Sequence, residues 1–274
     1  MSFSILNNIP ALQAESELSQ TQNSLQTTLQ QLSSGSRINS GADDAAGLAI
    51  ANGLQANITA LNQSIQNAND GVGSLQVADG ALSQVTTLLN RAVTLATEAS
   101  NGTVSSSQRN ALDAEFTQIK AEIDQIGTNT TFNGTSVFSA STTSIFLSDA
   151  NSSSTIAVSV GALSSGASGL GLTSSLTGTD GSNAQSALTQ IDAAIATVAG
   201  DRGTIGAAVN RLQAASNVIT NQVQNLTSAE NGITAADIPT AISNLSQYSV
   251  LMQTGMAALA QANSQEQNVL TLLH

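Results

Sequence analysis

Residues 54–96 read LQANITALNQSIQNANDGVGSLQVADGALSQVTTLLNRAVTLA, and their apolar side chains recur in alternating steps of four and three residues. This spacing puts one stripe along an α-helix and predicts a coiled-coil seam. Such a helix is about 65 Å long at 1.5 Å per residue. Only Asp79 and Thr86 break the pattern. The stripe consists of Leu54, Ile58, Leu61, Ile65, Ala68, Val72, Leu75, Asp79, Leu82, Thr86, Leu89, Val93 and Ala96.

A second stretch, residues 188–226, keeps the same alternation and predicts a second long helix. Its polar exceptions are Arg202 and Ser216. The stripe consists of Leu188, Ile191, Ile195, Val198, Arg202, Ile205, Val209, Leu212, Ser216, Ile219, Val223 and Leu226. A shorter helix is predicted from the stripe Leu112, Phe116, Ile119, Ile123 and Ile126.

The two ends of the chain carry narrower apolar stripes, flanked by Gln, Asn, Ser and Ala. Packing supplies most of a helix's stability, so each terminal helix alone is marginal in water. We therefore expect the terminal helices to pair with each other, which brings the two ends of the chain together. The stripes are Leu18, Leu25, Leu29 and Leu32 near the start, and Ile238, Ile242, Leu245, Met252, Met256 and Leu259 near the end.

The segments between these stripes carry turn residues and a different composition. Ser105–Ser107 offers an N-cap to the short helix, and Asn133-Gly134 indicates a turn. From about residue 130 to 178, Thr, Ser, Val, Ile and Phe dominate. Residues 144–147 and 156–160 therefore predict short strands. The expected order is three helices, a small β element and two helices.

The composition excludes several classes of protein. Hydrophobic residues make up 41% of the chain, aromatic residues 2% and charged residues 9%, so we expect long packed helices and an elongated molecule. Six basic residues in a chain of net charge −12 cannot form the cationic patch that nucleic acid or an anionic membrane requires. Without Cys there are no disulfides. We expect no cleaved signal peptide and no membrane span.

No group of residues predicts catalysis. His274 alone cannot form a triad or a metal site. The carboxylates of Asp43, Asp44, Glu115, Glu122 and Asp124 are better explained as solvated faces than as acid–base pairs. The glycines at 200, 203 and 206 lie inside a heptad stripe and lack the Gly-Lys-Ser/Thr ending of a phosphate loop. The sequence predicts no enzyme, no cofactor and no metal.

Several long strings resemble bacterial flagellins. They are QQLSSGSRINSGADDAAGLAIANGL at 30–54, IQNANDGVGSLQVADGALSQV at 65–85, TFNG at 131–134, NRLQAASNVITNQVQNLTSAENGI at 210–233, and AISNLSQYSVLMQTGMAALAQANSQEQNVLTLL at 241–273. The resemblance covers roughly 1–138 and 185–274. It implies a filament subunit exported through the flagellar type III channel, extracellular, with termini that order on assembly.

The resemblance also implies a division of the chain. Residues 1–44 and 236–274 are expected to form an inner rod, the terminal helix pair. Residues 45–138 and 180–235 are expected to form an outer-rod bundle, and 139–179 a short variable segment. The seams expected to carry assembly are Leu18, Leu25, Leu29, Leu32, Leu54, Ile58, Leu61, Ile65, Ile191, Ile195, Val209, Leu212, Ile242, Leu245, Met252 and Leu259.

Two smaller sites are carried over from the family. The loop that links the rods matches at Arg37, Asn39, Asp43 and Asp44, and we expect Arg37 to hydrogen-bond or to pair with a carboxylate in this turn. An innate immune receptor patch matches at three positions. Charged residues are typical of the family at three neighbouring positions where this chain differs, so we expect receptor recognition to be weakened or absent. The matching positions are Arg91, Leu95 and Glu115; the differing ones are Val93, Thr94 and Ile119.

The implied partners are other copies of the chain, a flagellar export chaperone, and hook-associated and cap proteins. Nucleic acid and membranes are not among them. The alternative function is a hook–filament junction protein, whose ends resemble flagellin. The Asn-Asp-Gly run at 69–71 and the Gln-Asn-Val-Leu ending favour the filament subunit.

Overall fold

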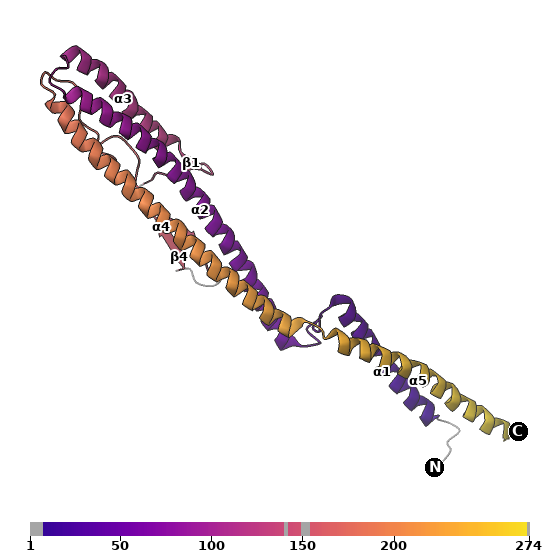
Figure 1. Cartoon of the computed structure of the whole chain (residues 1–274). Helices are drawn as coiled ribbons and strands as arrows, with labels where there is room; N and C mark the ends of the chain where they lie inside the picture. The colour runs from indigo at the N-terminus through magenta and orange to yellow at the C-terminus, as the bar shows by residue number, and fades with distance from the viewer. Residues whose placement is uncertain (1–7, 140–141, 149–153, 273–274) are drawn as a thin grey trace. The chain divides into compact units, whose positions relative to one another are not determined.

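The computed structural model describes residues 8–139, 142–148 and 154–272. In these residues the chain forms five helices and two small β-hairpins, as the sequence predicts (Figure 1). The helices are α1 (Ile9–Ser34), α2 (Ala45–Ser100), α3 (Ser106–Asn129), α4 (Ser182–Thr234) and α5 (Ile238–Leu272). His274 lies outside the described residues.

The chain divides into two compact units, each built from both halves of the sequence. Unit 1 contains residues 1–56 and 225–274, and unit 2 contains residues 57–224. In unit 1, α1 lies beside α5 (Figure 1). In unit 2, α2, α3 and α4 pack together around one apolar core. The expected pairing of the terminal helices is thus confirmed.

Local sequence explains where the helices begin and end. The Ser105 hydroxyl accepts from the backbone N–H of Gln108, and the Gln108 side chain accepts from the backbone N–H of Ser105. This capping box satisfies free N–H groups at the start of α3. Gly35, with φ of 71°, takes the left-handed conformation that ends α1, and its N–H donates to Gln31.

The β element consists of two separate antiparallel hairpins. Strands β1 (Thr131–Phe132) and β2 (Thr135–Ser136) enclose Asn133-Gly134, both at positive φ, as a tight hairpin turn requires. Strands β3 (Thr143–Phe146) and β4 (Thr155–Val158) pair with Ile145 opposite Ile156. Ile145 is buried and packs on Gly71 of α2, where a Cβ would collide with it.

The core stripe of α2 is displaced by one residue from half of the expected seam. Leu61, Ala68, Leu75, Leu82, Leu89 and Ala96 are buried as expected. From Ile65 onward the alternate expected positions are only half-buried, and the residues just before them are buried instead. The half-buried set is Ile65, Val72, Asp79, Thr86 and Val93, and the buried set is Ser64, Gly71, Ala78, Val85 and Ala92.

The stripe of α4 is displaced in the same way. Ile191, Val198, Ile205, Leu212 and Ile219 are buried as expected. Between them the buried face is completed by Ala187, Ala194 and Ala208, while Leu188, Ile195 and Val209 are half-buried. On α2 the small residues make room for the β3 segment: Ile145 packs against Gly71, and the Ser64 hydroxyl donates to the Ser148 carbonyl at 3.3 Å.

The segment from β4 to α4 has no regular structure but is held by side chains of the helices. Asp124 accepts from the backbone N–H and the hydroxyl of Ser165 at 2.6 and 2.9 Å. Asp113 accepts from the N–H of Leu176 at 2.7 Å. Leu176 is itself fully buried. Carboxylates on α3 thus supply hydrogen-bond acceptors for the N–H groups of this segment, as a neighbouring strand would have done.

Candidate functional site

The terminal helix pair of unit 1 is the first candidate surface. It has a narrow contact between α1 and α5. Leu18 lies against Gly255, where an added Cβ would be 3.2 Å from the Leu18 Cδ1. Asn8 caps α1 and donates from Nδ2 to the Ala262 carbonyl of α5 at 3.3 Å. Of the described side chains in α1, only Ala11 and Thr28 are buried.

The expected seam residues of this pair fall into two groups. The half-buried group lies along the contact and consists of Leu18, Leu25, Leu32, Leu245, Met252 and Leu259. The exposed group is Leu29 at 48%, Ile242 at 51% and Met256 at 52%. A pair of helices has a single mutual seam, and the remaining apolar side chains of a two-helix unit have nothing in the unit to cover them.

Further large apolar side chains on the same pair are exposed. They are Ile9 at 62% and Leu12 at 59% on α1, and Val250 at 57% and Leu251 at 44% on α5. Exposed apolar side chains gathered on one element typically mark an interaction surface. We call the set Ile9, Leu12, Leu29, Ile242, Val250, Leu251 and Met256 the terminal apolar surface.

The loop from Gly35 to Asp44, between α1 and α2, is a second candidate site. Arg37 donates from Nη2 to the Ile233 carbonyl at 2.9 Å, and its N–H donates to Thr234 at 2.6 Å. Its partners are therefore backbone carbonyls at the end of α4, not a carboxylate of the turn. Ser36 forms an antiparallel β-bridge with Ala235, which joins the segment after α1 to the segment after α4.

The acidic residues of this loop accept from its own backbone. Asp43 accepts from the N–H groups of Asn39 and Ser40 at 3.0 and 2.8 Å. These bonds lower the pKa of Asp43 below its ordinary value of 3.8. Asp44 accepts from the Gly47 N–H at 2.8 Å and so caps α2. Asn39 donates from Nδ2 to the Ser36 carbonyl at 2.9 Å. All four residues singled out in the sequence thus hold the loop's shape.

The expected seam residues of α2 and α4 lie at several depths. Ile58 and Leu61 are buried, as are Ile191 and Leu212. Leu54, Ile65, Ile195 and Val209 are half-buried. Their contacts serve the interior of the chain.

The receptor patch expected from the resemblance, on α2 and α3, contains one ion pair. Arg91 donates from Nε to Glu115 Oε1 at 2.7 Å. That hydrogen bond lowers the pKa of Glu115 and raises that of Arg91. Leu95 is only 1% exposed, within the core of unit 2. Two of the three matching residues are thus paired with each other at the surface, and the third is covered.

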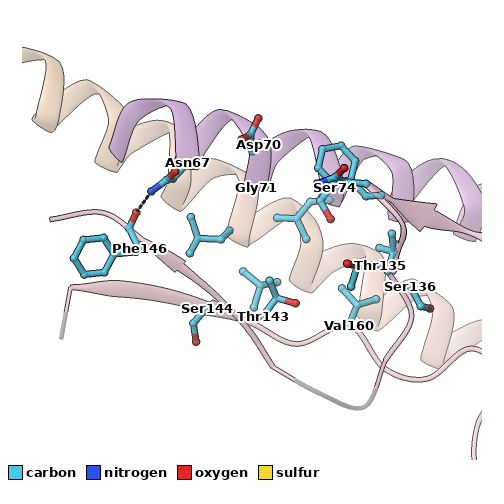
Figure 2. Close-up of a pocket in the computed structure, with 16 residues that line it drawn as sticks. Asn67, Asp70, Gly71, Ser74, Thr135, Ser136, Thr143, Ser144, Phe146 and Val160 are labelled. Carbon is cyan, nitrogen blue, oxygen red and sulfur yellow. Dashed lines mark hydrogen bonds between the residues drawn. The ribbon is translucent and has the colours of Figure 1, made fainter. Parts of the chain in front are cut away.

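A cavity of about 480 Å³ lies between α2 and the two hairpins (Figure 2). Its lining includes the apolar side chains of Leu75, Ile145 and Val160 and hydroxyl-bearing residues such as Ser74, Thr135 and Thr143. Asn67 donates to the Phe146 carbonyl at 3.2 Å and closes one end. Among the described residues no three His, Cys, Asp or Glu side chains are arranged to hold a metal ion. In the part of the chain that the structure describes, no helix is long and apolar enough to cross a membrane.

Sequence reasoning missed two features of unit 2. Arg109 is 1% exposed and donates to the carbonyls of Ala99, Asn101 and Gly178 at 2.8, 3.1 and 3.3 Å. It lies three residues before Leu112 and one heptad before Phe116, so its spacing continues the stripe of α3, but an arginine there gives no hydrophobic signal of burial. The second is the ion pair between Asp79 and Arg202, the two charged exceptions to the heptad pattern.

Comparison with known proteins gives a consistent result. The model of the bacterial flagellin N-terminal helical region matches residues 5–143, and that of the C-terminal helical region matches residues 188–273. The chain is 36% identical to a flagellin of Halalkalibacterium halodurans over 270 residues, which is 98% of this chain and 99% of that protein. It is 32% identical to a Bacillus subtilis flagellin over 303 residues, covering 98% and 99%.

A solved structure is also similar. The crystal structure of Bacillus cereus flagellin is 33% identical, with a TM-score of 0.49, and covers 60% of this chain and 94% of that one. The match to a flagellin of Salmonella muenchen, at 36% identity, spans 85% of this chain but only 44% of that longer protein.

Proposed function

The chain belongs to the bacterial flagellin family as a short structural subunit of the extracellular flagellar filament, not an enzyme, and from this premise we propose how it assembles. The terminal apolar surface, on α1 and α5, is the main contact between copies. Unit 1 corresponds to the inner rod, and α2 to α4 of unit 2 to the outer rod.

The observation that carries this proposal is the exposure of large apolar side chains on a narrow two-helix unit. Burying such a side chain contributes roughly 1.5–3 kcal/mol. Leu12 and Val250 are 59% and 57% exposed, so most of that contribution is unrealised in the single chain. Neighbouring copies can supply it, and a contact between different faces of successive copies builds an open helical polymer.

The loop at 35–44 has a structural part in this proposal. Asn39, Asp43 and Asp44 fix the turn between the two rods, and Arg37 fastens it to the end of α4. The seams of α2 and α4 hold the outer rod together as one body.

The export chaperone and the hook-associated and cap proteins belong to the same proposal. Each engages the terminal apolar surface at a stage when no filament neighbour covers it. Recognition by the innate immune receptor is weak or absent, because Leu95 is buried and Arg91 and Glu115 satisfy each other. A receptor reporter assay against a flagellin of known activity tests this point.

The assembly proposal is tested by charge on the terminal apolar surface. The double variant L12D/V250D places carboxylates where neighbouring copies should bury apolar groups. The matched control Q13D/Q247D adds the same charge at exposed polar positions of the same two helices. We expect the first variant to remain monomeric by sedimentation while the control polymerises. Equal polymerisation of both would refute the proposed contact.

A further inference from the structure

The sulfur atoms of this chain are few, and those that the structure describes lie on one helix. The chain has no Cys and three Met. Met1 lies outside the described residues, and Met252 and Met256 both belong to α5. A peroxide oxidises the thioether of Met to a sulfoxide, which is polar where the thioether is apolar. Within the described residues this chemistry is therefore confined to α5 of unit 1.

The two methionines differ in exposure although they are one helical turn apart. Met252 is half-buried and lies along the contact with α1, one heptad from Leu245 and one heptad from Leu259. Met256 is 52% exposed and is part of the terminal apolar surface. An oxidant in solution must reach the sulfur atom to react with it. Met256 is thus the more reactive of the two in the single chain.

Met256 borders the contact between α1 and α5 without entering it. At the residue before it, Gly255, an added Cβ would be 3.2 Å from Leu18 Cδ1, so α1 closes against α5 there. On the opposite flank, Gln253 and Ala260 lie three and four residues away along α5, and both are exposed. The Met256 side chain is therefore open to solvent in the single chain, and a neighbouring copy bound to the terminal apolar surface would cover it.

We propose that Met256 is an oxidation site that controls assembly: a peroxide converts its thioether to the sulfoxide in the free chain, and the sulfoxide blocks the contact between copies. With hydrogen peroxide, the sulfur loses two electrons and gains one oxygen atom, while the O–O bond breaks and water leaves. This inference rests on the proposed assembly through the terminal apolar surface and adds a chemical control to it.

The modification changes the group that a neighbouring copy has to bury. The thioether is apolar and adapts to irregular contacts. The sulfoxide oxygen is a hydrogen-bond acceptor, and burying a polar group without a donor is unfavourable. Every member of the terminal apolar surface is Leu, Ile, Val or Met, so no side chain of that surface can donate a hydrogen bond to the sulfoxide. Oxidation therefore opposes the contact.

Assembly protects the same sulfur atom. A copy that covers Met256 keeps an oxidant away from it, so the thioether reacts in the free chain and is shielded in the filament. The modification thus excludes an oxidised subunit from a growing filament but leaves a finished filament intact. A methionine sulfoxide reductase reverses the oxidation, so an excluded subunit can regain the ability to assemble.

Peptide mass spectrometry tests the accessibility of the two sulfur atoms. Purified free chain and seeded filaments are treated with the same dilute hydrogen peroxide, quenched with catalase and digested, and the sulfoxide at residues 252 and 256 is quantified over time. We expect Met256 to oxidise faster than Met252 in the free chain and to be slowed in the filament. A Met256 that oxidises no faster than Met252, or equally fast in both states, would overturn the inference.

Matched variants test the effect of oxidation on assembly. M256L removes the sulfur atom but keeps an apolar side chain of similar volume, and M252L does the same one turn away, while Met1 stays in both. After peroxide treatment, the critical concentration for polymerisation should rise about ten-fold for wild type and for M252L, as expected for burying an unpartnered polar group. It should stay unchanged for M256L.

The outcomes separate this inference from the proposed self-assembly. Treatment with methionine sulfoxide reductase should return the oxidised wild type to its untreated critical concentration. An oxidised wild type that assembles normally, or an M256L variant as sensitive to peroxide as wild type, would overturn the inference and leave the self-assembly proposal standing. Failure of the untreated wild-type chain to polymerise would instead refute the self-assembly itself.

Discussion

Arg202 donates from Nε to the Oδ1 of Asp79 at 2.7 Å, so the charged exception in one heptad stripe is paired with the charged exception in the other. A second bond, from Nη2 to Oδ2, is 3.3 Å long. Sliding α4 along α2 by one heptad would separate both charges from their partners. The pair therefore specifies the register of two helices whose apolar stripes repeat and could otherwise pack in several registers.

The first prediction concerns this pair. Both side chains are about 40% exposed, so screening by solvent should keep its coupling energy small. Arg202 lowers the pKa of Asp79 below 3.8, so its contribution is present above that pH and is lost as the pH falls through the lowered pKa. A double-mutant cycle with D79A and R202A should give this coupling at pH 7 and none near pH 2. Coupling that is equal at both pH values would contradict it.

The second prediction concerns Arg109, which joins the end of α2 to the segment before α4. R109M keeps much of the side-chain volume but leaves three carbonyls without their donor. We expect a loss of roughly 3 kcal/mol, since hydrogen bonds to charged groups contribute about 1.5–3 kcal/mol each and are not additive. Chemical denaturation measures it. R109K, which has no planar fork of donors, should recover only part of the loss. An R109M variant as stable as wild type would show that these three hydrogen bonds do not stabilise the fold.

The third prediction compares two glycines in helices. A Cβ at Gly127 would collide with the Leu163 backbone carbonyl, which cannot move without displacing the segment after β4. A Cβ at Gly200 meets nothing within 4 Å. G127A should destabilise the protein, while G200A should stabilise it by about 0.5–1 kcal/mol through helix propensity. Thermal melts of both variants measure these changes, and a G127A variant at least as stable as wild type would show that the close packing at Gly127 is absent.

The fourth prediction concerns Asp201, which occupies a place in the α4 stripe otherwise taken by alanines. Burial raises its pKa above 3.8, so the folded state favours the neutral form. The stabilisation of the folded state by the neutral carboxyl is complete below pH 3.8 and is lost as the pH rises through the raised pKa. D201N should therefore raise the Tm by about 2 °C at pH 7, a small effect because the group is partly exposed. At pH 3 the gain should vanish. The exposed Asp192 provides the control D192N, which should leave the Tm unchanged at both pH 7 and pH 3.

Much of this architecture follows from periodic signals in the sequence. The five helices, the Ser105 cap and the Asn133-Gly134 turn each depend on neighbours a few residues away, and all are confirmed. The predicted core stripes of α2 and α4 are confirmed at about every second position and are displaced by one residue at the others. Hydrophobicity selects Ile65 and Val72, whereas the smaller Ser64 and Gly71 are buried, because the segment around β3 packs on them.

Other features carry no local signal. The segment between β4 and α4 is held by Asp113 and Asp124, which are far from it in sequence. Arg109 is satisfied in the core because three carbonyls converge on it, two from the end of α2 and one from the segment before α4. Such polar contacts depend on how the chain returns on itself, and no period in the sequence reports them. Of the terminal apolar surface, the sequence stripes name Leu29, Ile242 and Met256 but not Ile9, Leu12, Val250 or Leu251, and they do not predict which apolar side chains are exposed.

The central claim is that the paired terminal helices carry assembly, and truncation measures it most directly. Purified full-length chain, a variant lacking residues 1–35 and a variant lacking residues 240–274 are seeded under identical conditions and imaged by electron microscopy. Circular dichroism checks that each truncated chain keeps a helical core. We predict long uniform filaments from the full-length chain and none from either truncated chain. Normal filaments from a truncated chain would contradict the claim.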